Sequence, residues 1–284
     1  MTTPIPHSRS AEPRPDQLFS LHNRTALITG ASRGIGAAAA RTLAAAGAHT
    51  ILLARSQASL QSVAEQIHDA GGRATVVVCD LTDPTATTDA CANVLDLSGG
   101  VDILVNNAGG PVFQADFRDV RDDGWEKVMN LNLTSTMRVT REIGRVMVER
   151  QRGSVINISS IGALQEWPEI TAYCAAKTAM LSLTRSLAAA WAPSNVRVNA
   201  ICPGWIDTDI NRAYTADPAR RAQTGSYVPL GGWAGPESMS GTILWLAADA
   251  SSFITGAVIP ADGGASIGLP ASVRAHLDPK AVMV

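Results

Sequence analysis

The chain has 284 residues, a formal net charge of −2 and 46% hydrophobic residues, which is enough for one large α/β domain or two small ones. Its lysines and arginines are scattered rather than gathered in a basic stripe, which argues against nucleic-acid binding, and no apolar run reaches the roughly 18 residues of a membrane span. The first twenty residues lack the apolar core of a signal peptide, so we expect a flexible N-terminal arm over 1–20.

The cysteines and histidines have no disulfide-like or metal-like spacing. The four cysteines (Cys79, Cys91, Cys174 and Cys202) are isolated, a pattern typical of reduced thiols in a cytoplasmic protein. The five histidines are scattered and lie away from the motifs described below. We therefore expect a cytoplasmic protein without a metal site, and we disfavour a His-based hydrolase or a zinc dehydrogenase.

Strand-like and helix-like segments alternate along the chain. The apolar runs read as buried strands at 25–30, 49–54, 74–80, 101–107, 154–160, 196–202 and 257–262. Alanine- and leucine-rich stretches with helical spacing lie at 34–46, 57–70, 84–97, 123–150, 173–191 and 236–248. This alternation predicts an α/β fold, a Rossmann-type doubly wound parallel sheet of about seven strands with helices on both faces. We expect one domain over 21–265 and a C-terminal tail over 266–284.

A glycine-rich turn follows the first strand, in "TALITGASRGIGAAAA", and contains Gly30, Gly34 and Gly36. Glycine permits positive φ and close approach of the backbone, and the following helix would direct free N–H groups at an anion. A dinucleotide pyrophosphate fits such a turn. The spacing T-G-x-x-x-G-x-G differs from the commoner G-x-G-x-x-G, and the alternative is a glycine-rich packing turn.

The end of the second strand indicates which dinucleotide would bind. Ala54 occupies the position where a carboxylate would hold a free ribose 2′-hydroxyl, and Arg55 follows it, with Arg33 inside the glycine turn. Two guanidinium groups without that carboxylate suit a 2′-phosphate. We expect NADP(H) rather than NAD(H); the alternative is that both arginines are solvated surface charges.

Asp80 ends the third strand-like run, in "CDLTD". Its carboxylate could accept a hydrogen bond from the adenine amino group. It could equally be only the N-cap of the next helix.

The ordered motifs resemble the short-chain dehydrogenase/reductase family over about residues 22–265. These motifs are "TGASRGIG" (29–36), "NNAG" (106–109), "NLN" (130–132), "SS" (159–160), "YCAAK" (173–177), "PGWIDT" (203–208) and "ADGG" (261–264). The resemblance implies a catalytic tetrad of Asn132, Ser160, Tyr173 and Lys177. Ser160 is preferred to Ser159 because it lies thirteen residues before Tyr173, the family's usual interval.

The chemistry of these residue types agrees with the implied roles. Tyr173 and Lys177 lie one helical turn apart, and a nearby ammonium group should favour the phenolate and lower the tyrosine pKa. The resemblance implies that Tyr173 donates or takes the proton, Ser160 binds the substrate oxygen, and Asn132 anchors a water that passes protons to solvent. It also implies that Lys177 holds the nicotinamide ribose. The alternative for Tyr173 is a helix tyrosine packed on the sheet.

The glycine turn, the arginines and the resemblance together imply a set of cofactor contacts. They are Gly30, Ser32, Arg33, Gly34, Ile35, Gly36, Arg55, Asp80, Leu81, Asn107, Ala108, Gly109, Tyr173, Lys177, Pro203, Gly204, Ile206 and Thr208. The resemblance implies that Ile206 and Thr208 bind the carboxamide and that Ala108 and Gly109 let the backbone approach the cofactor. Asn106 would tie the fourth strand near the cofactor, or it could be mainly a bridge between strands.

Two segments, 161–170 and 205–232, should form the walls of the substrate pocket, and we expect 205–232 to be a mobile lid. Candidate lining residues are Phe113, Leu164, Trp167, Trp205, Tyr214 and Tyr227, although each could instead pack the lid against the body. Arg220 and Arg221 could meet an acidic substrate or carrier, but a solvated helix face is the plainer interpretation.

The resulting hypothesis is an NADPH-dependent reductase of a ketone or 3-oxoacyl-type carbonyl, with a tyrosine as proton donor. The alternatives are an NAD(P)-dependent alcohol or sugar dehydrogenase working towards oxidation and, more remotely, a non-catalytic dinucleotide sensor. The partner would be a small-molecule carbonyl or alcohol, with no nucleic acid or membrane. The resemblance implies a homotetramer assembled through 123–150, 173–191 and the last strand.

Overall fold

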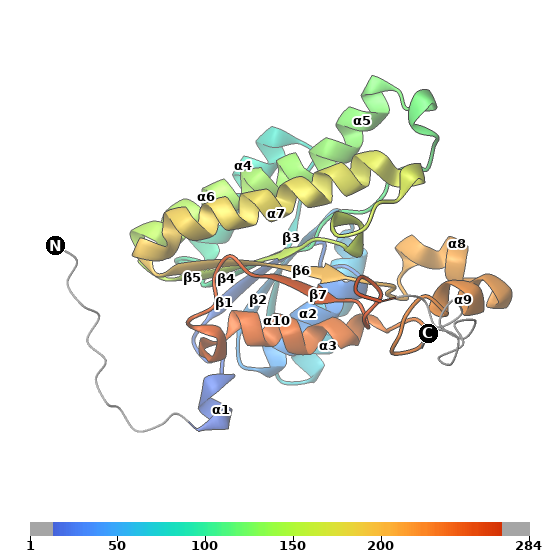
Figure 1. The fold of residues 1–284 in the computed structure, drawn as a ribbon. Coiled ribbons are helices and arrows are strands. Elements are labelled where there is room, and N and C mark those ends of the chain that lie inside the picture. The colour runs from blue at the N-terminus through green and yellow to red at the C-terminus, as the bar shows by residue number, and fades with distance from the viewer. Residues whose placement is uncertain (1–13, 269–284) are drawn as a thin grey trace, which may run out of the picture.

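The computed structural model describes residues 14–268 and contains a seven-stranded sheet in the order β3-β2-β1-β4-β5-β6-β7 (Figure 1). All neighbouring strands pair in parallel. The strands are β1 (Thr25–Thr29), β2 (His49–Ala54), β3 (Arg73–Val78), β4 (Ile103–Asn106), β5 (Gly153–Ile158), β6 (Val196–Pro203) and β7 (Val258–Ala261). The predicted fold class is confirmed.

Helices cover both faces of this sheet (Figure 1). One face carries α2 (Gly34–Ala45), α3 (Gln57–Asp69) and α10 (Ser240–Ala247), and the other carries α4 (Pro84–Ser98), α5 (Asp122–Met129), α6 (Ser135–Glu149) and α7 (Thr171–Trp191). Single 3₁₀ turns lie at Phe117–Asp119, Ile161–Ala163, Pro168–Ile170, Ala192–Ser194, Asp209–Asn211, Pro236–Met239 and Asp249–Ser251.

The strands read as continuous apolar runs because both of their faces are buried. Successive side chains point to opposite faces, so Leu27 joins the core under α4 and α6 while Ile28 joins the core under α2 and α10. Ile51 and Leu52 divide in the same way, and all four side chains have no exposed surface. Packing on both faces holds the sheet in place and therefore sets the position of the carboxyl ends of its strands.

The helix predicted over 123–150 is interrupted. A π-helical turn at Asn130–Thr134 separates α5 from α6. Asn132 is fully buried there, and its amide group hydrogen-bonds Val128 within the helix and Gly110 outside it. Such insertions of a side chain into the helical ladder distort a helix locally.

The sheet has its switch point between β1 and β4, because β2 and β3 extend from one side of β1 and β4 to β7 extend from the other. A ligand crevice is expected at the carboxyl ends of the strands at such a point. The segment 205–232 lies near these ends and is largely helical, with α8 (Arg212–Thr215) and α9 (Pro218–Gly225).

The predicted arm and tail fall partly outside the described residues, which exclude 1–13 and 269–284. Within the arm, α1 (Pro15–Leu18) forms a single helical turn. Of the helices between residues 14 and 268, none is both long enough and apolar enough to cross a membrane.

Candidate active site

Two adjoining hollows lie at the carboxyl ends of the strands. The first, which we call the cleft, is lined by the glycine turn after β1 and by the residues that follow β2, β3 and β4. The second, which we call the pocket, lies beside Ser160 and Tyr173. Gly109, Gly110, Thr208 and Ile210 line both hollows, so the cleft leads directly into the pocket.

The glycine turn has the geometry expected of a site for a phosphate group. Gly30 has φ +64°, and a Cβ atom there would lie 2.9 Å from Asn107 Nδ2. A Cβ at Gly36 would collide with the Gly30 carbonyl oxygen, so only glycine fits. Helix α2 begins at Gly34 without any side-chain cap, which leaves its first N–H groups available to an anion. These residues therefore fit the pyrophosphate of a dinucleotide.

Both arginines proposed for a 2′-phosphate line the cleft. The end of β2 carries no carboxylate, as predicted, but each arginine faces a carboxylate from another element. Arg33 lies 3.3 Å from Asp209, and Arg55 lies 4.0 Å from Asp80. The sequence analysis did not indicate these two acidic neighbours, which come close because parallel strands bring the residues that follow them to one edge.

Two serines next to Arg55 were missed. Ser56 and Ser59 line the same cleft, and their hydroxyl oxygens lie 2.9 Å apart. Ser56 is also the N-cap of α3, accepting from Ser59 N at 3.4 Å. A serine between the end of a strand and the start of a helical stretch is a signal for an N-cap and could have indicated the Ser56 hydroxyl.

Asp80 lies just past the end of β3, and both Asp80 and Leu81 line the cleft. Its Oδ1 atom accepts from Thr82 N at 3.0 Å and from Thr82 Oγ1 at 2.8 Å, and these bonds lower the pKa of the carboxyl group. Asp83, not Asp80, caps helix α4 by accepting from Ala86 N. The N-cap interpretation of Asp80 was therefore wrong, and its carboxylate is positioned at the cleft.

The paired asparagines after β4 have different roles. Asn106 is buried and donates to Thr140 Oγ1 at 2.8 Å and to Asn157 Oδ1 at 2.9 Å. It is thus a bridge between β4, β5 and α6, which was the second of the two alternatives. Asn107 lines both hollows and donates to the Thr29 and Gly30 carbonyl oxygens, while the neighbouring Ala108 and Gly109 line the cleft.

The Asn132 side chain hydrogen-bonds backbone groups of two segments. Its Oδ1 atom accepts from Gly110 N at 2.8 Å, and its Nδ2 atom donates to the Gly110 and Val128 carbonyl oxygens. Both ends of the amide group are therefore engaged by protein. A Cβ atom on Gly109 would lie 2.6 Å from Asn132 Oδ1 and 3.3 Å from Lys177 Nζ, so Asn132 and Lys177 meet at Gly109.

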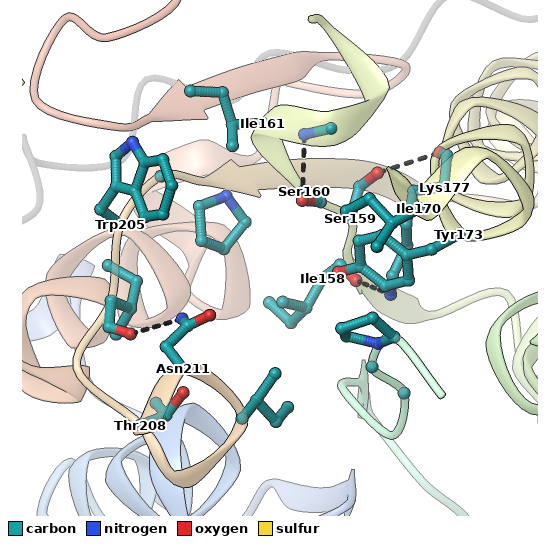
Figure 2. Close-up of a pocket in the computed structure, with 18 of the residues that line it drawn as sticks. Ile158, Ser159, Ser160, Ile161, Ile170, Tyr173, Lys177, Trp205, Thr208 and Asn211 are labelled. Atoms are coloured by element: carbon teal, nitrogen blue, oxygen red, sulfur yellow. Dashed lines mark hydrogen bonds between the residues drawn. The ribbon is translucent and has the colours of Figure 1, made fainter. Parts of the chain in front are cut away.

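The two adjacent serines after β5 also differ. Ser159 is buried, and its hydroxyl group donates to the Lys177 carbonyl oxygen at 3.0 Å. Ser160 accepts from Gly162 N at 3.0 Å, and a Cβ atom on Gly162 would lie 3.4 Å from Ser160 Oγ and 3.8 Å from Tyr173 Cε1. Ser160 is therefore the serine that lies beside Tyr173 (Figure 2).

Tyr173 and Lys177 lie one turn apart on α7 and both line the pocket. The Lys177 side chain is buried, its Nζ donates to the Ile158 carbonyl oxygen at 2.8 Å, and the same Nζ lies 5.7 Å from the centroid of the Tyr173 ring. Burial lowers the pKa of Lys177 to about 8.

The expected lowering of the tyrosine pKa is not found. Burial raises the pKa of Tyr173 to about 12, although the neighbouring Ser160 hydroxyl acts in the opposite direction. The physical reason is that loss of water disfavours the phenolate. Burial also disfavours the charged form of Lys177, whose ammonium group donates to a carbonyl oxygen. The protein alone thus holds the proton on the phenol.

The opposite wall of the pocket comes from the segment after β6 (Figure 2). Pro203, Gly204, Ile206 and Thr208 line this wall, as expected. Of the six candidate lining residues, Trp167, Trp205 and Tyr214 line the pocket, whereas Phe113, Leu164 and Tyr227 are not among its lining residues. Gln114 and Asn211, which the sequence did not single out, also line it.

Comparisons with known proteins agree with this geometry. The family model described as enoyl-(acyl carrier protein) reductase matches residues 30–266. A 2-dehydro-3-deoxy-D-gluconate 5-dehydrogenase of Pseudoalteromonas atlantica is 38% identical, with 87% of this chain and 97% of the relative aligned.

Two solved structures are similar across almost their whole length. A gluconate 5-dehydrogenase from Burkholderia cenocepacia in complex with NADP and tartrate is 33% identical with a TM-score of 0.86, covering 90% of this chain and 100% of that one. A 3-oxoacyl (acyl-carrier-protein) reductase from Agrobacterium tumefaciens with NADP bound is 37% identical with a TM-score of 0.84, covering 88% and 97%. The matched family, the parallel sheet and the Ser160–Tyr173–Lys177 geometry show that this chain belongs to the short-chain dehydrogenase/reductase family, a family of oxidoreductases acting on CH–OH and C=O groups.

Proposed function

We propose that this protein reduces a ketone to a secondary alcohol with NADPH. The observation that carries the proposal is the junction of the two hollows, where Ser160, Tyr173 and Lys177 line a pocket that continues into a cleft containing Arg33 and Arg55. A bound NADPH would supply the hydride, and the protein must supply the proton and stabilise the developing negative charge on oxygen.

Tyr173 is suited to the acid role because its proton stays on the phenol at neutral pH, with a pKa raised by burial to about 12. The Ser160 hydroxyl group would orient the substrate oxygen towards the same phenol. Lys177, whose ammonium group lies against the Tyr173 ring, would favour the phenolate left behind after proton transfer. Asn132 would act through Gly110 by holding the loop that lines both hollows.

The preference for NADPH over NADH is supported by charge at the cleft. Arg33 and Arg55 expose 67% and 75% of their side chains, so both can turn towards a 2′-phosphate. Ser56 and Ser59 add hydroxyl donors beside them. Guanidinium and hydroxyl groups are the donors that phosphate oxygens accept. The two solved structures named above with NADP bound are consistent with this preference.

The second candidate is the oxidation of a sugar acid or alcohol. It is favoured by the relatives named as gluconate-type dehydrogenases. The pocket and its Tyr173 would serve either direction, because the group that donates a proton in reduction accepts it in oxidation. NADP(H) favours reduction, since cells keep that cofactor largely reduced.

The direct test follows NADPH absorbance with a panel of ketones, aldehydes and 3-oxoesters, and NADP⁺ reduction with gluconate and simple sugars. We expect turnover of ketones with NADPH and at most weak turnover with NADH. Oxidation of the sugar acids as the only measurable reaction would replace our proposal by the second candidate. Tight NADPH binding with no turnover in either direction would favour the remote alternative, a non-catalytic sensor.

On the basis of the family resemblance we also propose a homotetramer located in the cytoplasm. Sedimentation velocity at micromolar concentration should give the mass of four chains. A concentration-independent monomer would contradict the proposed assembly.

A further inference from the structure

Among the described residues that line the pocket, only Lys177 carries a charge. Its ammonium group is buried and donates to the Ile158 carbonyl oxygen at 2.8 Å. Three arginines lie in the segment after β6. Arg212 is paired with Asp209 at 2.7 Å and Arg221 with an aspartate at 2.6 Å, while Arg220 is exposed and does not line the pocket. A substrate carboxylate placed away from the reacting carbonyl would therefore lose water without gaining a cation, which is costly.

Two amide groups of the pocket each donate one hydrogen bond within the protein. Asn211 Nδ2 donates to the Ile206 carbonyl oxygen at 2.8 Å, and Gln114 Nε2 donates to the Tyr214 hydroxyl at 2.9 Å. A polyhydroxylated substrate needs several partners, because each hydroxyl that leaves water unpaired costs free energy. Beyond the two reacting hydroxyl groups, few donors remain for such a substrate; one of them is Trp167 Nε1, which is buried and has no hydrogen-bond partner in the protein.

Flat apolar surfaces make up much of the remaining lining. Trp205 stands across the pocket from Ser160 and Tyr173 (Figure 2). Its ring centroid lies 5.1 Å from that of Trp167 and 5.9 Å from that of Tyr214, in edge-to-face geometry. Six isoleucines also line the pocket: Ile35, Ile158, Ile161, Ile170, Ile206 and Ile210. Aromatic and aliphatic walls of this kind favour an apolar or aromatic group on the substrate.

The size of the pocket limits that group. Its volume is about 180 Å³, and an apolar cavity of about 150 Å³ is known to hold one benzene molecule. The pocket also opens into the cleft and would hold the nicotinamide end of the cofactor beside Ile206 and Thr208, so it favours a substrate with no more than one six-membered ring.

We propose that the substrates of this protein are small, uncharged ketones bearing one apolar or aromatic ring, rather than the sugar acids in the names of its relatives. This inference rests on the proposed ketone reduction, because it specifies the substrate class of the same pocket. It follows from the missing cation, the small number of free donors, the aromatic wall and the volume.

The test compares two ketones that share a ring and differ in one charge. Methyl 4-acetylbenzoate and 4-acetylbenzoate place an ester or a carboxylate across the ring from the acetyl group. With NADPH we expect kcat/KM to be at least about tenfold higher for the ester, mainly through a lower KM, because the carboxylate loses hydration without a partner. Equal or better use of the acid would overturn the inference.

A charge introduced at the pocket rim sharpens this comparison. Gln114 is exposed there, and Gln114→Arg should raise kcat/KM for 4-acetylbenzoate relative to the ester by about fivefold. Gln61→Arg adds the same charge at an exposed position on α3 that does not line the pocket, and it should leave the ratio unchanged. An unchanged ratio in Gln114→Arg would contradict the argument from charge.

Binding separates this inference from the proposed reaction. Ligand-observed NMR with the protein and NADP⁺ gives the affinities of both ketones without turnover. If the ester binds more tightly but neither ketone is reduced, the substrate class stands and ketone reduction fails. If the acid binds as tightly as the ester, the inference is overturned whether or not turnover occurs.

Discussion

Replacing Arg55 by alanine should weaken NADPH binding more than NADH binding. Its guanidinium group lines the cleft, is 75% exposed and lies 4.0 Å from the Asp80 carboxylate, so that carboxylate holds it loosely. A hydrogen bond to a charged group is worth about 1.5–3 kcal/mol, and solvent screening of an exposed pair reduces this to about 1 kcal/mol. The dissociation constant for NADPH should therefore rise about fivefold, while that for NADH changes by less than about twofold.

The cleft offers a matched change of opposite sign. Asp209 lies 3.3 Å from Arg33, so its carboxylate competes with any phosphate for that guanidinium group. Asp209→Asn removes the competing charge and should tighten NADPH by about two- to fivefold. Fluorescence titration of both variants with NADPH and with NADH is the assay. If Arg55→Ala weakens the binding of NADPH and NADH equally, Arg55 does not bind the 2′-phosphate. If Asp209→Asn weakens NADPH binding, Asp209 does not compete with the phosphate for Arg33.

Two further predictions concern the proton and the glycine turn. Burial lowers the pKa of Lys177 to about 8, so its charge is present below that pH and lost above it. The value of kcat/KM for reduction should therefore fall as pH rises through about 8. A flat pH profile up to pH 9 would contradict the role of the Lys177 charge in favouring the phenolate. Gly36→Ala places a Cβ against the Gly30 carbonyl oxygen and 2.5 Å from Asn107 Nδ2, which should cost about 1–3 kcal/mol and lower the melting temperature by several degrees. The control Gly241→Ala, where a Cβ meets nothing within 4 Å, should be neutral or slightly stabilising; equal melting temperatures for the two variants would argue against close packing at Gly36.

The fold and the local motifs could be predicted because the residues that indicate each of them lie close together in the sequence. Tyr173 and Lys177 are one helical turn apart. Gly30 directly follows a strand, and Gly34 and Gly36 lie in the first turn of a helix, both of which the apolar pattern already indicates. Buried parallel strands also leave an unmistakable apolar run. These features need no knowledge of distant contacts.

What the sequence did not indicate depends on contacts between distant segments. Arg33 meets Asp209 across 176 positions, and Gln114 meets Tyr214 across 100. The break between α5 and α6 is stabilised by Asn132, which binds Gly110 from another element. No periodicity within a helix encodes such pairs, because tertiary packing alone brings the partners together.

The direction of the Tyr173 pKa shift was also beyond the sequence. A lysine one turn away favours a lowered pKa, but the sign depends on how deeply each group is buried. Burial raises the pKa of Tyr173 and lowers that of Lys177, and neither burial is visible in the spacing of the two residues.

The most direct test of the account is Tyr173→Phe, which removes one hydroxyl group from the pocket and leaves the ring. Because this phenol is the proposed proton donor, turnover of any ketone found in the panel should fall by about 10²–10⁴-fold, while the dissociation constant for NADPH stays within about twofold. Turnover within about tenfold of the wild-type rate, with NADPH bound as before, would show that the proton comes from another group.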